Sequence, residues 1–98
     1  MAKVYKADGT VEELDIPSGQ ELGYEICSSL VGGMIQVLPT PEGSEYDTLV
    51  CNEEGKLKGL PINEKATNEF RSVLLPGDVL VGDVFVCNTD LEEGTMLA

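Results

Sequence analysis

The segment from Asn52 to Thr67 holds the densest group of residues able to bind a ligand or a partner. An acidic turn, Asn52-Glu53-Glu54-Gly55, leads into two lysines, and Gly59 and Pro61 interrupt the chain before Asn63. Flexible backbone amides beside the glycines, and the free amides of a helix that begins at Asn63, favour an anion. An ordinary turn followed by a capped helix is the favoured interpretation, since no G-x-x-x-x-G-K-[ST] phosphate loop is present. The ligand- or partner-binding residues predicted here are Asn52, Glu53, Glu54, Gly55, Lys56, Lys58, Pro61, Asn63 and Thr67.

Enzymatic chemistry has little support in this chain, because it contains no histidine. This removes the most common general base, the Ser-His and Cys-His nucleophile pairs, and histidine-based zinc sites. Neighbouring carboxylates such as Glu53 and Glu54 point to opposite faces of a strand, so they indicate solvated surface. The acidic turn lacks the spacing of a calcium-binding EF-hand loop. We therefore predict a non-enzymatic protein with no metal site and no cofactor.

Charge is the strongest global feature: 18 acidic residues oppose six basic ones, which gives a net charge of −12. Such a surface repels nucleic acid and anionic membranes, so neither is an expected partner. It favours a protein with a basic surface, or it serves only solubility. The acidic residues are spread along the chain, with a denser cluster at Asp90, Glu92 and Glu93.

The three cysteines indicate a reducing compartment, hence a cytoplasmic location. Cys27, Cys51 and Cys87 are odd in number, lack C-x-x-C spacing and follow no apolar signal peptide. Each has an apolar neighbour, so buried thiols are expected. No apolar run approaches the ~20 residues of a membrane span.

The first half of the chain predicts a hairpin, a helix and two strands. Asp8-Gly9 is a turn signal within a hairpin over residues 4–16. Ser18 and Glu21 have capping-box spacing, which predicts a helix from about residue 19. Gly32-Gly33 ends that helix with a left-handed cap. Strands are expected over residues 34–38 and 48–51, separated by a polar loop.

The second half predicts an edge strand at residues 56–58, a helix capped by Asn63, and a turn at residues 76–78. Residues 79–86 predict one long central strand bent or bulged at Gly82, the alternative being a hairpin turn at Gly82-Asp83. The 98 residues suffice for one domain. We predict a single α+β domain over residues 1–88, followed by a flexible acidic tail at residues 89–98. The expected sheet is mostly antiparallel, with about five to six strands and two short helices on one face.

Several short motifs resemble one known family. They are Asn52-Glu53-Glu54-Gly55, Gly59-Leu60-Pro61-Ile62-Asn63, Ala66-Thr67, Val81-Gly82-Asp83-Val84, the opening hairpin and Val31-Gly32-Gly33-Met34-Ile35. Over residues 3–86 the chain resembles the small phage and bacterial proteins catalogued as domain of unknown function 3846. The resemblance carries no catalytic residues. It implies an origin in phage genomes or mobile elements, where small acidic proteins act as accessory factors against host defences.

Two functions are expected from these features together. The first is stoichiometric binding and inhibition of a host protein with a basic surface, in the host cytoplasm if the protein is phage-encoded. The alternative is a homo-oligomer that sequesters a small nucleotide-type signalling molecule, with Lys56 and Lys58 meeting the ligand.

Overall fold

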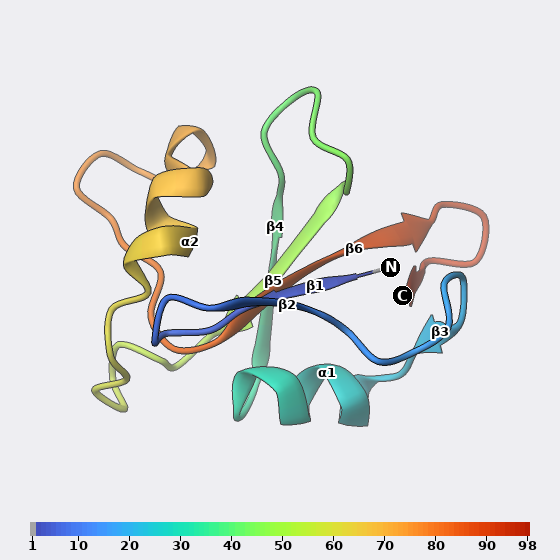
Figure 1. Ribbon diagram of the computed structural model, residues 1–98, viewed down its shortest axis with the longest axis horizontal. Coiled ribbons are helices and arrows are strands. Elements are labelled where there is room, and N and C mark those ends of the chain that lie inside the picture. The colour runs from blue at the N-terminus through green and yellow to red at the C-terminus, as the bar shows by residue number, and fades with distance from the viewer. Residues whose placement is uncertain (1) are drawn as a thin grey trace.

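Seven short strands and two helices make up the computed structural model, which describes residues 2–98 (Figure 1). The helices are α1 Tyr24–Val31 and α2 Glu64–Glu69, and a 3-10 turn at Arg71–Val73 follows α2. The strands are β1 Lys3–Tyr5, β2 Val11–Glu13, β3 Glu21–Leu22, β4 Ile35–Pro39, β5 Thr48–Asn52, β6 Val84–Asp90 and β7 Thr95–Leu97. The expected α+β class is confirmed, with more strands than expected.

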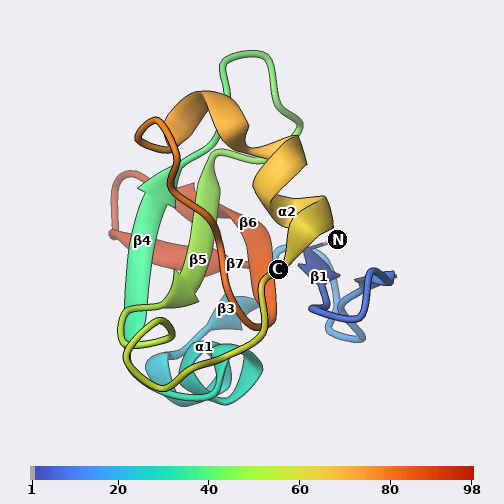
Figure 2. The same ribbon diagram turned by 90° about the vertical axis from the view of Figure 1, so that its left-hand side faces the viewer.

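All strand pairs of the sheet are antiparallel. Along its main path the strand order is β2-β1-β6-β5-β4, and β7 pairs with the far end of β6 and with β3. Twist accumulates from strand to strand. The sheet therefore curls into a half-barrel, in which β4 lies at a steep angle to β6 (Figures 1 and 2).

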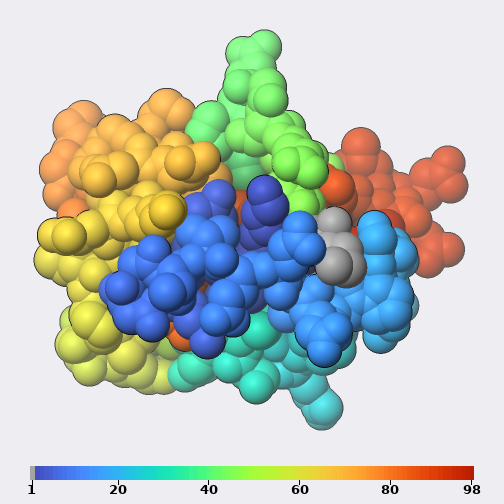
Figure 3. Space-filling model, viewed as in Figure 1, coloured from blue at the N-terminus to red at the C-terminus, as the bar shows by residue number. Residues whose placement is uncertain are grey.

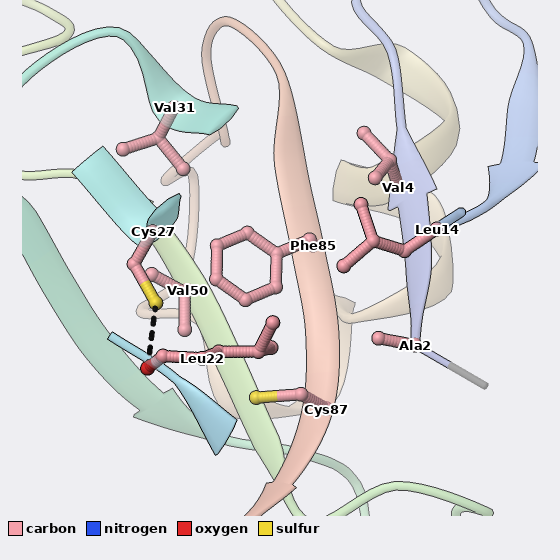
Figure 4. Close-up of a cluster of buried hydrophobic side chains, with 9 residues drawn as sticks. All are labelled: Ala2, Val4, Leu14, Leu22, Cys27, Val31, Val50, Phe85 and Cys87. Atoms are coloured by element: carbon pink, nitrogen blue, oxygen red, sulfur yellow. Dashed lines mark hydrogen bonds between the residues drawn. The ribbon is translucent and has the colours of Figure 1, made fainter. Parts of the chain in front are cut away.

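The central strand β6 is buried on both faces over residues 84–87. Phe85 lies at the centre of a cluster with α1, together with Ala2, Val4, Leu14, Leu22, Cys27, Val31, Val50 and Cys87 (Figure 4). The neighbouring residues Val84 and Val86 belong to a second cluster with α2, which also holds Tyr5, Leu49, Cys51, Ala66, Phe70 and Leu80. Because successive side chains of a strand point to opposite faces, α1 and α2 cover different faces of β6. The expectation that both helices share one face is therefore not confirmed. A strand that is apolar on both sides requires a cover on both.

The opening hairpin is confirmed, but α1 begins later than its capping signal predicts. The chain turns instead at Pro17–Gln20, where Gln20 N–H donates to the Pro17 carbonyl (3.1 Å). Residues 21–22 then form β3 against β7, so tertiary pairing overrides the local helix signal. The helix starts after Gly23 and ends, as expected, at Gly32 with φ of 81°.

The end of the chain belongs to the sheet rather than to the flexible tail expected for residues 89–98. The predicted bend at Gly82 is confirmed, with φ of 71°, and residues 82–83 form neither a bulge nor a hairpin turn. The strand expected over residues 79–86 actually begins at Val84 and runs to Asp90. Residues 95–97 return as β7, and Met96 and Ala98 pack against the α1-side cluster.

Residues 56–58 do not form the expected edge strand. They lie in consecutive turns, in which Lys58 N–H donates to the Glu54 carbonyl (3.0 Å) and Gly59 N–H to the Lys56 carbonyl (3.2 Å). The preceding strand β5 already has β4 and β6 as neighbours, so these residues have no place beside it. Leu57 consequently remains 88% exposed.

Candidate functional site

Asn52 and Gly55 hold the acidic turn in place from the inside. Asn52 is 5% exposed; its Nδ2 donates to the Val31 carbonyl at 3.1 Å, and its Oδ1 accepts from Glu54 N–H at 2.8 Å. It thereby connects the end of β5 to the end of α1. Gly55 is buried, and a Cβ there would lie 2.6 Å from Val81 Cγ2, so a larger residue would not fit. Glu53 and Glu54 by contrast reach the surface.

Asn63 is fully buried and joins three parts of the chain. Its Nδ2 donates to the carbonyls of Tyr5 (2.8 Å) and Gly82 (2.9 Å), and its Oδ1 accepts from Ala66 N–H (3.1 Å). The predicted N-cap of α2 is therefore confirmed, and the same side chain also ties α2 to β1 and to the bend before β6. Sequence alone indicated only the cap.

Thr67 has a similar structural role one helical turn later. Its hydroxyl accepts from Leu80 N–H at 2.9 Å and lies 3.4 Å from the Leu80 carbonyl. Pro61 is exposed, but its carbonyl accepts from Gly82 N–H at 2.7 Å. Gly82 itself packs closely, since a Cβ on it would lie 2.9 Å from Leu60 Cδ1. These residues cross-link the backbone and leave few groups free for a ligand.

The two lysines of the segment do not converge on one anion site. Lys56 forms an ion pair with Asp78, while Arg71 donates to the Asp78 carbonyl at 2.8 Å. Hydrogen bonding from the Lys56 ammonium, joined by Val79 N–H, holds the pKa of Asp78 below its usual range. Lys58 turns toward the end of α1, where its Nζ lies 2.7 Å from the position a Cβ on Gly33 would take.

A cleft of about 290 Å³ lies between the β4–β5 surface and the chain that follows α2. Its lining is Gln36, Leu38, Cys51, Asn52, Glu53, Lys56, Val73, Leu74, Leu75, Asp78, Val79, Leu80 and Val81. Of these residues, Asn52, Glu53 and Lys56 were predicted as binding residues from the sequence, whereas the cleft itself was not predicted. The predicted turn at residues 76–78 was the sequence signal for the cleft, because that turn carries residues 73–81 past the sheet.

The cleft contains one thiol that is poorly suited to nucleophilic chemistry. Burial raises the pKa of Cys51 to about 11, with Asp78 adding to the effect and Lys56 opposing it. Its Sγ lies 3.8 Å from Gln36 Oε1, to which it donates. At neutral pH the thiol is thus protonated, whereas thiolate is the reactive form. Within residues 2–98, no three His, Cys, Asp or Glu side chains gather to hold a metal ion.

Acidic groups outnumber basic ones over the surface of the molecule as a whole. None of the 18 carboxylates is buried. Among residues 2–98, the ion pairs engage only three of them: Glu12 with Lys6, Glu45 with Lys3, and Asp78 with Lys56. Most carboxylates therefore face solvent without a cation. No helix in the described part of the chain has the length and apolar character needed to cross a membrane.

Fold and site together define a small α+β domain with a curled antiparallel sheet, an acidic surface and a cleft beside β4. The profile of one protein family, described as Domain of unknown function (DUF3846), matches residues 3–98, and the chain belongs to this family. The match confirms the resemblance and extends it to the end of the chain, including β7. Comparisons with curated proteins and with solved structures gave no significant match.

Proposed function

We propose that this protein is a non-enzymatic binding protein that acts by stoichiometric association with a protein bearing a basic surface. The observation that carries the proposal is the large excess of solvent-facing carboxylates without cationic partners. A basic partner would relieve the mutual repulsion of these charges, and the opposite charges would speed association.

The family resemblance supplies the proposed biological setting. Small acidic accessory proteins of phages and mobile elements block host factors by occupying them, so we propose a host defence protein in the cytoplasm as the partner. Inhibition then requires only that the bound protein cover a functional surface of that factor. It needs no catalytic group and no cofactor.

The nucleotide-sequestering alternative has less support. The cleft volume of about 290 Å³ is close to the lower limit for small-molecule sites. However, Lys56 is already paired with Asp78, and Glu53 also lines the cleft, which opposes an anionic ligand. Lys58 lies at the end of α1 rather than in the cleft lining.

The test begins with native mass spectrometry of tagged protein recovered from a bacterial lysate at low salt. We expect a protein-sized added mass at fixed stoichiometry, whereas an added mass of a few hundred daltons would favour the sequestering alternative. Binding of the identified partner is then measured by calorimetry at about 50 and 300 mM salt, and we expect a clear loss of affinity at the higher concentration. Salt-independent affinity would contradict the electrostatic basis of the proposal.

A pair of charge variants tests whether the surface near the cleft is the one that binds. The double substitution Glu53→Gln and Glu54→Gln removes two charges beside the cleft, and Glu92→Gln with Glu93→Gln removes the same number at the β6–β7 hairpin. We expect the first variant to weaken binding about tenfold and the second by less than threefold. Equal losses would indicate a diffuse effect of net charge.

A further inference from the structure

The two ends of the main strand path, β2 and β4, differ in charge. At one border lies β2, Val-Glu-Glu, whose two carboxylates protect it against pairing with another strand. At the other lies β4, Ile-Gln-Val-Leu-Pro, which carries no charge in a chain whose net charge is −12. Val37 on β4 is 53% exposed and the preceding Met34 is 51% exposed. The structure thus leaves an uncharged strand at one border of the sheet, where Figure 2 shows β4 on the outer side of β5.

The backbone of β4 presents hydrogen-bonding groups along this border. Glu53 N–H donates to the Met34 carbonyl at 2.8 Å, so Met34 faces β5 in the ladder. Groups alternate along an antiparallel strand. The N–H and C=O groups of Ile35 and Val37 therefore point away from β5, and within residues 2–98 no strand pairs with them. Pro39 shares this orientation, which suits a residue without an N–H group.

Acidic residues lie at both ends of this strand. At the Ile35 end, Asn52 of β5 lies opposite Ile35, and Glu53 and Glu54 follow Asn52 in the chain. At the Pro39 end, the loop over residues 40–47 carries Glu42, Glu45 and Asp47 and projects from the body of the molecule (Figure 3). A segment laid along β4 would therefore meet an uncharged centre between two acidic ends.

The cleft adds a side-chain site on one face of the same border. Gln36 and Leu38 of β4 line it, together with Leu74 and Leu75, and Leu75 is 75% exposed. In an added strand, every second side chain would lie on the face of Gln36 and Leu38, beside the cleft. Recognition by strand addition combines such pockets for alternate side chains with backbone hydrogen bonds.

We propose that β4 binds an extended segment of the partner as an additional strand, and that this segment is β-branched at its centre and basic at its ends. The inference rests on the proposed function and specifies which surface carries it. A second copy of this chain is a poorer occupant, because two chains of net charge −12 repel each other.

The experiment uses the full chain and a defined probe, the peptide Ac-RKVTVTVRK-NH2. Its control has the same sequence with N-methyl groups on the central valine and the threonine after it. Methylating two successive amides blocks both edges of the peptide as a strand and preserves every charge. Affinity is measured by calorimetry at about 50 mM salt. We expect the methylated peptide to bind at least tenfold more weakly, as the loss of one or two backbone hydrogen bonds predicts.

Two proline variants locate the binding border. Val37→Pro removes an outward N–H of β4 and leaves its bonds to β5 intact. Val11→Pro is the matched control on β2, since Leu14 N–H donates to the Ala2 carbonyl (2.7 Å) and the alternation turns Val11 outward. We expect about tenfold weaker peptide binding for Val37→Pro and a change below twofold for Val11→Pro. Circular dichroism of both variants checks that they are folded.

Hydrogen exchange on the unmodified protein provides a readout that depends on no variant. Saturating peptide is expected to slow exchange of the Ile35 and Val37 amides at least tenfold, with little change at Val11 and Glu13. Equal binding of both peptides, or unchanged exchange at Val37, would overturn strand addition and leave the proposed basic partner standing. If neither peptide binds at low salt, both proposals fail. A dimer of the free protein that Val37→Pro abolishes would make a second copy the occupant and overturn this inference.

Discussion

Replacing Asn63 tests how the segment following β5 holds the fold together. The side chain is fully buried and makes three hydrogen bonds, two from Nδ2 to carbonyls and one from Ala66 N–H to Oδ1. Asn63→Ala removes all three and leaves the carbonyls of Tyr5 and Gly82 without this donor. The substitution thus removes the hydrogen bonds that join the start of α2 to β1 and to the bend before β6.

The expected loss follows from these contacts. Loss of the N-cap costs about 1 kcal/mol. The Tyr5 carbonyl also faces Val84 in the β1–β6 ladder, so losing the bond from Asn63 costs about 1 kcal/mol there. The Gly82 carbonyl loses its donor, which costs about 1.5 kcal/mol. We therefore expect Asn63→Ala to lower the free energy of unfolding by about 3.5 kcal/mol. That is a large fraction of the ~5–15 kcal/mol typical of a domain.

Equilibrium urea unfolding, followed by far-ultraviolet circular dichroism, measures this loss. Asn63→Ser retains an oxygen for the cap but lacks the amide donors, so we expect it to recover only about 1 kcal/mol. Asn68→Ala is the matched control, because Asn68 is exposed on the same helix, and its effect should stay within about 0.5 kcal/mol. A loss below about 1 kcal/mol for Asn63→Ala, with an unchanged urea slope, would refute the assigned role of the two carbonyl contacts.

Four further substitutions test neighbouring features by the same unfolding assay. Gly82→Ala should cost about 3 kcal/mol and Gly77→Ala about 1–2 kcal/mol, since both have positive φ but only Gly82 lacks space for a Cβ; equal losses would mean that packing contributes nothing. Burial raises the pKa of Cys51 to about 11. The buried neutral thiol therefore contributes its full stabilisation below the unfolded thiol pKa of about 8.5, and this stabilisation is lost as pH rises through about 11. Cys51→Ala should therefore flatten the decline of stability above about pH 8.5, and an unchanged decline would contradict this origin. Lys56→Ala should cost less than about 1 kcal/mol, because its pair with Asp78 lies at the surface; a larger loss would show that the pair organises the cleft.

Local signals in the sequence predicted the elements that depend on neighbouring residues. The turn at Asp8-Gly9, the left-handed cap at Gly32 and the N-cap at Asn63 each follow from the backbone preferences of a few adjacent residues. Strands β4 and β5 were equally visible, since their apolar runs are bounded by turn residues. The α+β class followed from the order of these elements.

Elements that depend on distant pairing could not be predicted in this way. Leu22 belongs to β3 only because Met96 of β7 lies opposite it, and the two residues are far apart in the sequence. Without β7, the Ser18–Glu21 spacing would favour a helix, and the last residues would resemble a tail. The cleft was missed for the same reason, because residues 73–81 meet β4 and β5 only in the folded chain.

The candidate site divides into residues that build the fold and residues available for binding. Asn52, Gly55, Asn63 and Thr67 are buried, and their bonds and close packing connect β5, α1, α2 and the bend at Gly82. The motifs that carry the family resemblance are therefore accounted for mainly by folding.

Binding must instead use groups that these buried residues hold at the surface. Asn52 fixes the turn that presents Glu53 and Glu54 at one end of β4, while the chain following α2 forms the wall of the cleft beside that strand. A substitution at Asn52 would thus impair binding through the fold, whereas Val37→Pro or the Glu53 and Glu54 changes act on the surface directly. Comparing their effects on stability and on affinity separates the two roles: surface changes should reduce affinity at nearly constant stability, and the buried asparagines should reduce both.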